Sequence, residues 1–244
     1  TGELRKMKKS FIIIKPDALR NNFIKKKIIR EIKQNNITIE KKIKIRLTLE
    51  EVDILWPQTR KSTILNGLLK CYLTLEYSEV LFLVGNFSDE QLNDLKWKIR
   101  DEYAVCKFSN CLHTPADENE CTQQLQYLEN RNNYSHPYTE IPNTSLKIWQ
   151  LINVYGWNYD FSNCNKKKYV LYLLNDNYNT VDHVAETISN VLKKYSIEVS
   201  YILAIQAEMN DCILLDGFDN EIECNKIKEI LIENYLNIKK EVLS

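Results

Sequence analysis

The sequence predicts two α+β units in series, joined by a linker that carries some structure. Short apolar runs alternate with amphipathic helical patterns at both ends of the chain, and turn-forming residues separate them. The central stretch has a different texture, rich in Asn, Tyr and Ser. A chain of 244 residues is long enough for two domains that each bury a core. We therefore expect units at residues 1–130 and 169–244, with the linker at residues 131–168.

Strands and helices alternate in the expected first unit. Pro16 ends a first apolar run, and the patterns from Thr48 to Glu51 and from Ser88 to Gln91 are capping boxes that start helices. We expect strands at residues 10–14, 37–47 and 80–84, with weak alternation over 103–112. We expect helices over residues 23–32, 48–56 and 63–73, from residue 88 onward, and over 118–129.

The second unit shows the same two kinds of pattern. Between the units, a short helix is expected at residues 146–154. In the second unit we expect strands at residues 169–174 and 212–215, and helices at 181–192, 196–209 and 222–237. The helix over residues 181–192 has a strongly apolar face.

Composition narrows the class of protein. No apolar run is long enough to cross a bilayer, so no membrane partner is expected. Seven scattered cysteines without a CxxC pair indicate reduced thiols in a cytoplasmic setting, or in a plastid-like organelle if the source is eukaryotic. The first 48 residues hold fifteen Lys and Arg against four Asp and Glu, which suits either phosphates or a solvated helix face. Nucleic acid is not an expected partner, because no aromatic residues interleave with these basic residues.

Three segments of the first unit resemble the nucleoside diphosphate kinase family. The run Phe11–Asp17 (FIIIKPD) is similar to that family's opening strand and K-P-D signature. The run Ile99–Tyr103 (IRDEY) is similar to its I-R-G-D-F segment, and Asn110–His113 (NCLH) stands where the family has N-x-x-H. The three segments occur in the right order and spacing, and the resemblance covers residues 10–128.

The resemblance implies a ferredoxin-like α+β domain in which His113 accepts a phosphoryl group from a nucleoside triphosphate. It implies that Lys15 and Arg100 hold phosphates and that Asn110 bonds the ribose or a phosphate. The cofactor implied is Mg²⁺ carried by the nucleotide, with no metal site in the protein. The family commonly forms hexamers or tetramers, so a homo-oligomer is also expected.

The chain also departs from the kinase pattern. Trp56 stands at the family's tyrosine, and Gln124 stands at the glutamate that orients the histidine; we expect both in the nucleotide site. Pro115 takes the place of a serine, and a phosphate-binding loop before Arg100 is missing. These changes favour an alternative in which the first unit binds partners without catalysis, as a pseudoenzyme.

Residues 169–244 resemble the ClpS adaptor family. Three segments are similar to that family: Leu174–Val181 (LNDNYNTV), Leu203–Gln206 (LAIQ), and Gly217–Phe218 with Glu221 and Lys226. The resemblance implies a small α+β domain that delivers N-degron peptides to a AAA+ Clp ATPase.

The adaptor resemblance also implies a set of peptide-binding residues. Asn175 and Asp176 would grip the peptide's α-amino group, because an ammonium binds a carboxylate and a carbonyl placed together. Gln206 replaces the family's histidine and Val181 its methionine. An ordinary strand-to-helix turn is the alternative interpretation of Asn175 and Asp176.

Two functional hypotheses follow. The first is a nucleoside diphosphate kinase-like phosphotransferase, working through phosphohistidine at His113, fused to a ClpS-like adaptor domain. The second is a non-catalytic adaptor or scaffold that brings substrates to a Clp protease, with the kinase-like half used for binding only. Retention of Lys15, Arg100, Asn110 and His113 favours the enzyme, whereas Pro115 and Gln124 favour the scaffold.

Overall fold

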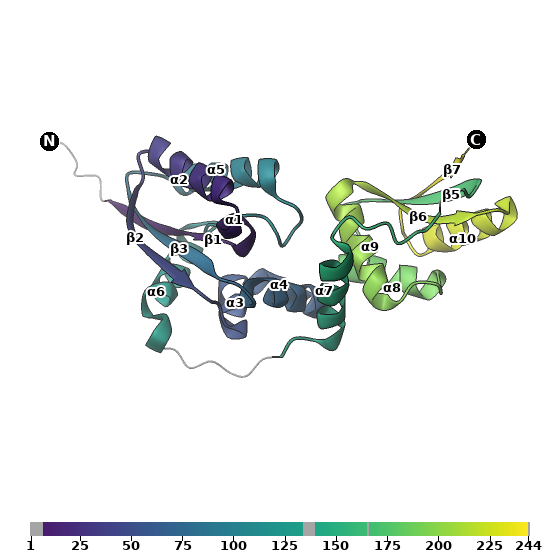
Figure 1. The fold of residues 1–244 in the computed structure, drawn as a ribbon, viewed down its shortest axis with the longest axis horizontal. Coiled ribbons are helices and arrows are strands. Elements are labelled where there is room, and N and C mark those ends of the chain that lie inside the picture. The colour runs from purple at the N-terminus through teal and green to yellow at the C-terminus, as the bar shows by residue number, and fades with distance from the viewer. Residues whose placement is uncertain (1–6, 134–139, 165, 244) are drawn as a thin grey trace. The chain divides into compact units, whose positions relative to one another are not determined.

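The computed structural model describes residues 7–133, 140–164 and 166–243. It divides the chain into two compact units, Thr1–Ile141 and Pro142–Ser244 (Figure 1). Each unit has its own antiparallel sheet and its own buried core.

The first unit contains a four-stranded antiparallel sheet. Its strands are β1 (Lys8–Ile14), β2 (Thr38–Ile45), β3 (Ser78–Gly85) and β4 (Leu112–His113), in the order β2-β3-β1-β4. Apart from extra helices between β2 and β3, the chain runs β-α-β-β-α-β, which is the ferredoxin-like connectivity. The expected ferredoxin-like class is therefore found in this unit.

Helices cover both faces of this sheet. They are α1 (Pro16–Arg20), α2 (Asn22–Gln34), α3 (Leu49–Leu55), η1 (Pro57–Lys61), α4 (Thr63–Thr74), α5 (Asp89–Tyr103), α6 (Glu118–Asn130) and η2 (Arg131–Asn133). Apolar side chains of α2 and α5 pack on one face, and Figure 1 shows α3 and α6 on the other side of the sheet. Both faces of β1 are thus buried, which explains its unbroken apolar sequence.

Local signals set most of these boundaries. Both predicted capping boxes are present, with Thr48 at the start of α3 and Ser88 at the start of α5. The helix expected after Pro16 is split, because Asn21 is extended and its side chain caps α2. The alternation expected over residues 103–112 forms little strand, since α5 continues to Tyr103 and only the last two residues before Thr114 pair with β1.

The second unit contains a three-stranded antiparallel sheet in the order β6-β5-β7. Its elements are α7 (Asn143–Tyr155), β5 (Tyr169–Leu174), α8 (Val181–Val191), α9 (Ile197–Asn210), β6 (Cys212–Phe218), α10 (Glu221–Glu233) and β7 (Ile238–Val242). The last helix was expected to reach Asn237, but it stops earlier and a third strand follows. Tyr235 has a left-handed backbone (φ 66°), which turns the chain from α10 into β7.

Helix α9 explains why the second unit begins well before the expected Tyr169. All eight residues from Ser200 to Ala207 are buried, so this helix needs neighbours on every side. Helix α7 packs against it, with Ile148 fully buried and Lys147 Nζ 3.5 Å from Glu198 Oε1. Much of the expected linker therefore belongs to the second unit's core; residues 134–139 and 165 of that linker lie outside the described residues.

The structure also bears on the cysteines and on membrane-spanning helices. All seven cysteines are free thiols, as expected. Among the described residues, no helix combines the length and the apolar character needed to cross a membrane.

Candidate functional site

The ends of β1 and β4 build the first candidate site. Strand β4 pairs with β1 so that His113 lies opposite Ile13, two residues before Lys15. The backbone N–H of Lys15 donates to the carbonyl of Cys111 (2.9 Å), and Cys111 has a left-handed backbone (φ 71°). This turn brings the Asn110 and His113 side chains back to the end of β1.

Lys15 is buried among neutral acceptors. Its side-chain nitrogen donates to Asn110 Oδ1 (2.6 Å) and lies 3.4 Å from the carbonyl oxygen of Phe108. The same nitrogen lies 5.4 Å from the centre of the Trp56 ring. Burial, and then the nearby charge of Arg100, lower the pKa of Lys15 to about 7.

Arg100 is tied to the backbone beside His113. Its Nη2 and Nε atoms donate to the carbonyl of Leu112 at 2.8 and 3.3 Å. The guanidinium also lies over the ring of Trp97, 5.3 Å from its centre. Its charge is therefore held next to the histidine by neutral groups.

His113 is buried and held by one hydrogen bond. Its Nε2 atom lies 2.9 Å from Gln124 Oε1, and its ring centre lies 4.9 Å from that of Trp56. The ring of Phe11 lies 6.0 Å away on the central strand. These contacts fix the orientation of the imidazole.

The network around Gln124 also decides which ring nitrogen carries the proton. Gln124 Nε2 donates to the carbonyl of Leu55 (3.0 Å) and to Glu120 Oε1 (2.8 Å). Both of those partners are acceptors, so Gln124 must present its oxygen to His113. The proton of a neutral imidazole then sits on Nε2, which leaves the Nδ1 lone pair free. Nδ1 forms no hydrogen bond with any residue that the structure describes.

The charge state of His113 suits a nucleophile. Burial lowers the pKa of His113 to about 3; the Gln124 hydrogen bond opposes this, and the charges of Lys15, Arg100 and Lys96 add to it. The ring is therefore neutral at pH 7. A neutral imidazole with a free lone pair can attack an electrophilic phosphorus atom.

All six residues expected in the nucleotide site lie together in the first unit: Lys15, Trp56, Arg100, Asn110, His113 and Gln124. Two further side chains belong to the same surroundings. Asp17 accepts from the backbone N–H of Cys111 (2.9 Å) and from the Tyr72 hydroxyl, so it shapes the turn before His113. Lys96 lies one helical turn before Arg100, a spacing already readable in the sequence.

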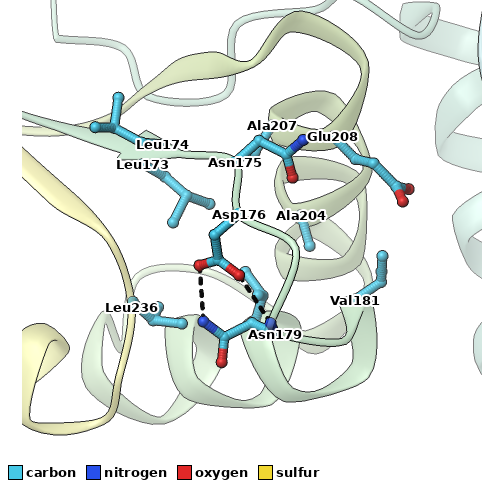
Figure 2. Close-up of a pocket in the computed structure, with 11 residues that line it drawn as sticks. Leu173, Leu174, Asn175, Asp176, Asn179, Val181, Ala204, Ala207, Glu208 and Leu236 are labelled. Atoms are coloured by element: carbon cyan, nitrogen blue, oxygen red, sulfur yellow. Dashed lines mark hydrogen bonds between the residues drawn. The ribbon is translucent and has the colours of Figure 1, made fainter.

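The second candidate site is a pocket between the end of β5 and helices α8 and α9 (Figure 2). It has a cavity volume of about 40 Å³, with apolar walls and a few polar side chains. Its lining residues include Leu173, Asn175, Asp176, Val181, Ala204 and Glu208. Three of the four residues expected to bind a peptide therefore line this one pocket.

Asn175 and Asp176, the two residues expected to bind an ammonium, differ in their hydrogen bonding. Asp176 Oδ1 accepts from the backbone N–H groups of Tyr178 (2.9 Å) and Asn179 (2.7 Å), and Oδ2 accepts from the Asn179 amide (2.8 Å). Burial acts to raise the pKa of Asp176, but the hydrogen bonds from Asn179 and Tyr178 outweigh it and lower the pKa. The side chain of Asn175 points into the pocket in Figure 2 and forms no hydrogen bond with any described residue.

Gln206 is not among the residues that line the pocket. Its side-chain nitrogen donates to the carbonyls of Trp157 and Tyr159, both at 2.9 Å, and so holds the segment after α7 against α9. Glu208, two residues later, does line the pocket and adds a second acidic residue to its lining. Glu208 was not singled out in the sequence, because its position depends on how α9 packs.

Comparisons with known proteins gave matches among solved structures. An orthorhombic crystal form of the Aquifex aeolicus nucleoside diphosphate kinase aligns with 17% identity and a TM-score of 0.41, covering 50% of this chain and 95% of that chain. An NDP kinase from Pyrobaculum aerophilum aligns with 15% identity and a TM-score of 0.40, with the same coverage. No family model matches the chain. No curated protein matches it.

Proposed function

We propose that the first unit is a nucleoside diphosphate kinase-like phosphotransferase that works through phosphohistidine at His113. The observation that supports it most is the fixed tautomer of His113. A neutral ring, with its proton held on Nε2 by Gln124, presents Nδ1 as the nucleophile beside Lys15 and Arg100.

The proposed reaction has two half-steps. Nδ1 of His113 attacks the γ-phosphorus of a nucleoside triphosphate, the bond to the bridging oxygen breaks, and the nucleoside diphosphate leaves with the electron pair. A second nucleoside diphosphate then attacks the phosphohistidine and takes the phosphoryl group, which restores neutral His113. The Nε2 proton stays in place throughout, hydrogen-bonded to Gln124 Oε1.

The neighbouring side chains have distinct roles in this proposal. Lys15 and Arg100 stabilise the negative charge on the phosphoryl oxygens, in a buried setting where such interactions are strong. Asn110 positions the Lys15 ammonium through its 2.6 Å hydrogen bond. Gln124 carries no charge, so it stabilises the developing positive charge on the imidazole less than a carboxylate would.

Mg²⁺ belongs to the nucleotide in this proposal. Among the described residues, no group of three or more His, Cys, Asp or Glu side chains is placed to hold a metal ion. The neutral and cationic side chains around His113 fit an ion that arrives already bound to phosphate. When bound, Mg²⁺ neutralises part of the phosphate charge.

The test is incubation with Mg²⁺ and ATP labelled at the γ-phosphate, followed by analysis of the protein-bound label. We expect label that is lost in acid and kept in alkali, and no such label in His113→Gln. His183→Gln, which replaces a histidine of the second unit, is the matched control and should be labelled like the wild type. If the wild type carries no label with any nucleotide, phosphotransfer is excluded and only the scaffold alternative survives.

The second unit supports a second function, binding of peptides through their free α-amino group. The supporting observation is a pocket whose lining combines the Asn175 amide, the Asp176 and Glu208 side chains and several apolar residues. The carboxylates would attract the ammonium, and the apolar walls would contact the first side chain. A AAA+ Clp ATPase would be the partner that receives such peptides.

Peptide titration tests this second function. Peptides that begin with a free Leu, Phe or Trp should bind, and their acetylated counterparts should not. Asn175→Ala should weaken binding at least about tenfold, the effect of losing one hydrogen bond to a charged group. Asn177→Ala, at an exposed position in the same turn, is the matched control. Equal binding of acetylated peptides would contradict recognition of the ammonium.

A further inference from the structure

Lys96 on α5 is a buried cation without an anionic partner. Lys96 is only 8% exposed, yet its side chain forms no ion pair or hydrogen bond with any described residue. Its Nζ atom lies over the ring of Trp97, 5.7 Å from the ring centre. By contrast Lys70, the other deeply buried lysine on a helix of this unit, lies 2.8 Å from Asp53 Oδ2.

Burying an ammonium costs free energy unless an anion or several acceptors compensate for it. Burial, followed by the charge of Arg100, lowers the pKa of Lys96, while Glu120 acts in the opposite direction. The Glu120 carboxylate accepts from the Ala116 N–H (2.6 Å) and from the Gln124 amide (2.8 Å), and it forms no ion pair with Lys96. Within the first unit, the cost of burying the Lys96 ammonium is therefore only weakly offset.

Lys96 belongs to the surroundings of His113. It lies one turn before Arg100 on α5, and both cationic groups lie over the same Trp97 ring. Lys15 and Arg100 likewise hydrogen-bond only to neutral acceptors within the described part of the chain. The charges of Lys15, Arg100 and Lys96 all act on His113, and none of the three forms an ion pair with a carboxylate among the described residues.

We propose that Lys96 binds the phosphates of the nucleotide that reacts at His113, as a third cation beside Lys15 and Arg100. A polyphosphate would supply several negative charges, whereas Asp17 and Glu120 act on these cations without forming an ion pair with any of them. The inference rests on the proposed function for the identity of the site, but phosphate binding can be measured without phosphoryl transfer.

The test is calorimetric titration of the full chain with inorganic tripolyphosphate and with Mg²⁺–ADP. Lys96→Met keeps the apolar stem and removes the charge, and it should weaken both affinities by about ten- to a hundredfold, the range for a hydrogen bond to a charged group. Lys96→Arg should recover most of the loss. Lys98→Met removes an exposed lysine from the same helix, paired with Glu31, and should bind like the wild type.

The outcomes separate this inference from the proposed function. Weaker binding in Lys96→Met supports it whether or not His113 becomes labelled. Unchanged affinity in Lys96→Met overturns it even if His113 is labelled normally, and so does a wild type that binds neither ligand. If Lys96→Met does not fold, the side-chain ammonium signal of Lys96 in ¹⁵N-lysine-labelled wild type, assigned by its loss in Lys96→Arg, should shift on addition of tripolyphosphate. No shift would overturn the inference.

Discussion

At the scale of single residues, Gln124 determines which ring nitrogen of His113 carries the proton. A buried imidazole has two equivalent choices for its one proton, and its surroundings must select one of them. Here the Gln124 side-chain nitrogen donates to Leu55 and Glu120, so the Gln124 oxygen faces the ring and accepts from Nε2. The resulting free Nδ1 is a consequence of three side-chain and backbone contacts rather than of the histidine itself.

Gln124→Leu should therefore impair phosphohistidine formation without removing the histidine. The leucine keeps the volume but offers no acceptor, so the ring can rotate and its proton is no longer held on Nε2. We expect the rate of labelling to fall about tenfold or more, as measured by single-turnover labelling with γ-labelled ATP. Gln123→Leu, at the exposed neighbouring position, is the matched control. An unchanged labelling rate in Gln124→Leu would contradict the role assigned to this amide.

His113 should also make the first unit sensitive to acid. Its pKa is about 3 in the folded protein against 6.5 for the free side chain, so below pH 6.5 the unfolded chain binds a proton that the folded chain does not. The free energy of unfolding should then fall as pH drops from about 6.5 towards 3, by at most about 1.4 kcal/mol per pH unit.

Urea unfolding at a series of pH values measures this effect. His113→Gln should flatten the dependence in that interval, because the neutral amide does not titrate. If His113→Gln loses stability in acid as steeply as the wild type, His113 is not the group responsible.

At the scale of elements, helix α9 organises the second unit. It is buried from Ser200 to Ala207, so its sequence shows no polar stripe and says little about which neighbours cover it. Helix α7 is one of these neighbours. Gln206 on α9 donates to the carbonyls of Trp157 and Tyr159, and so holds the segment after α7 against α9. Helix α7, which lies in the expected linker, is therefore part of the packed structure of the second unit.

Ile148→Ala should destabilise the second unit. Ile148 is fully buried on α7, and removing such a side chain leaves a cavity that costs about 2–5 kcal/mol. Val154→Ala on the same helix changes a residue that is 73% exposed and should alter stability by less than about 0.5 kcal/mol. Denaturant unfolding followed by circular dichroism and tryptophan fluorescence measures both. Equal effects of the two substitutions would mean that α7 does not pack as described.

At the scale of the whole molecule, the chain is two folding units with separate candidate sites. The boundary lies between Ile141 and Pro142, after which α7 begins. All six residues of the proposed nucleotide site lie before it, and the pocket with Asn175 and Asp176 lies after it. Each proposed activity should therefore be separable from the other.

Expression of fragments tests this division. Residues 1–141 should fold and carry the His113 label, and residues 142–244 should fold and bind peptides that have a free α-amino group. Residues 169–244 lack α7, so α9 would expose apolar surface and we expect no cooperative unfolding transition. A cooperative fold for residues 169–244 would show that α7 is dispensable.

Much of the local structure can be predicted from the amino-acid sequence. Capping residues such as Thr48 and Ser88 act on backbone groups within four positions, and strands such as β1 and β5 are marked by their own side chains. Through the family resemblance, the sequence also predicted which five residues would lie around His113. Short-range hydrogen bonding and apolar patterning carry this information, and both can be read along the chain.

The remaining features depend on how the elements pack together. Whether α7 belongs to a core, whether Gln206 faces the pocket, and whether Lys96 has a partner all depend on residues far away in sequence. Strand β7 was missed for the same reason, since its pairing with β5 follows from a turn at Tyr235. Burial and partnership are properties of the packed molecule. They set the charge of His113, and so the chemistry proposed for it.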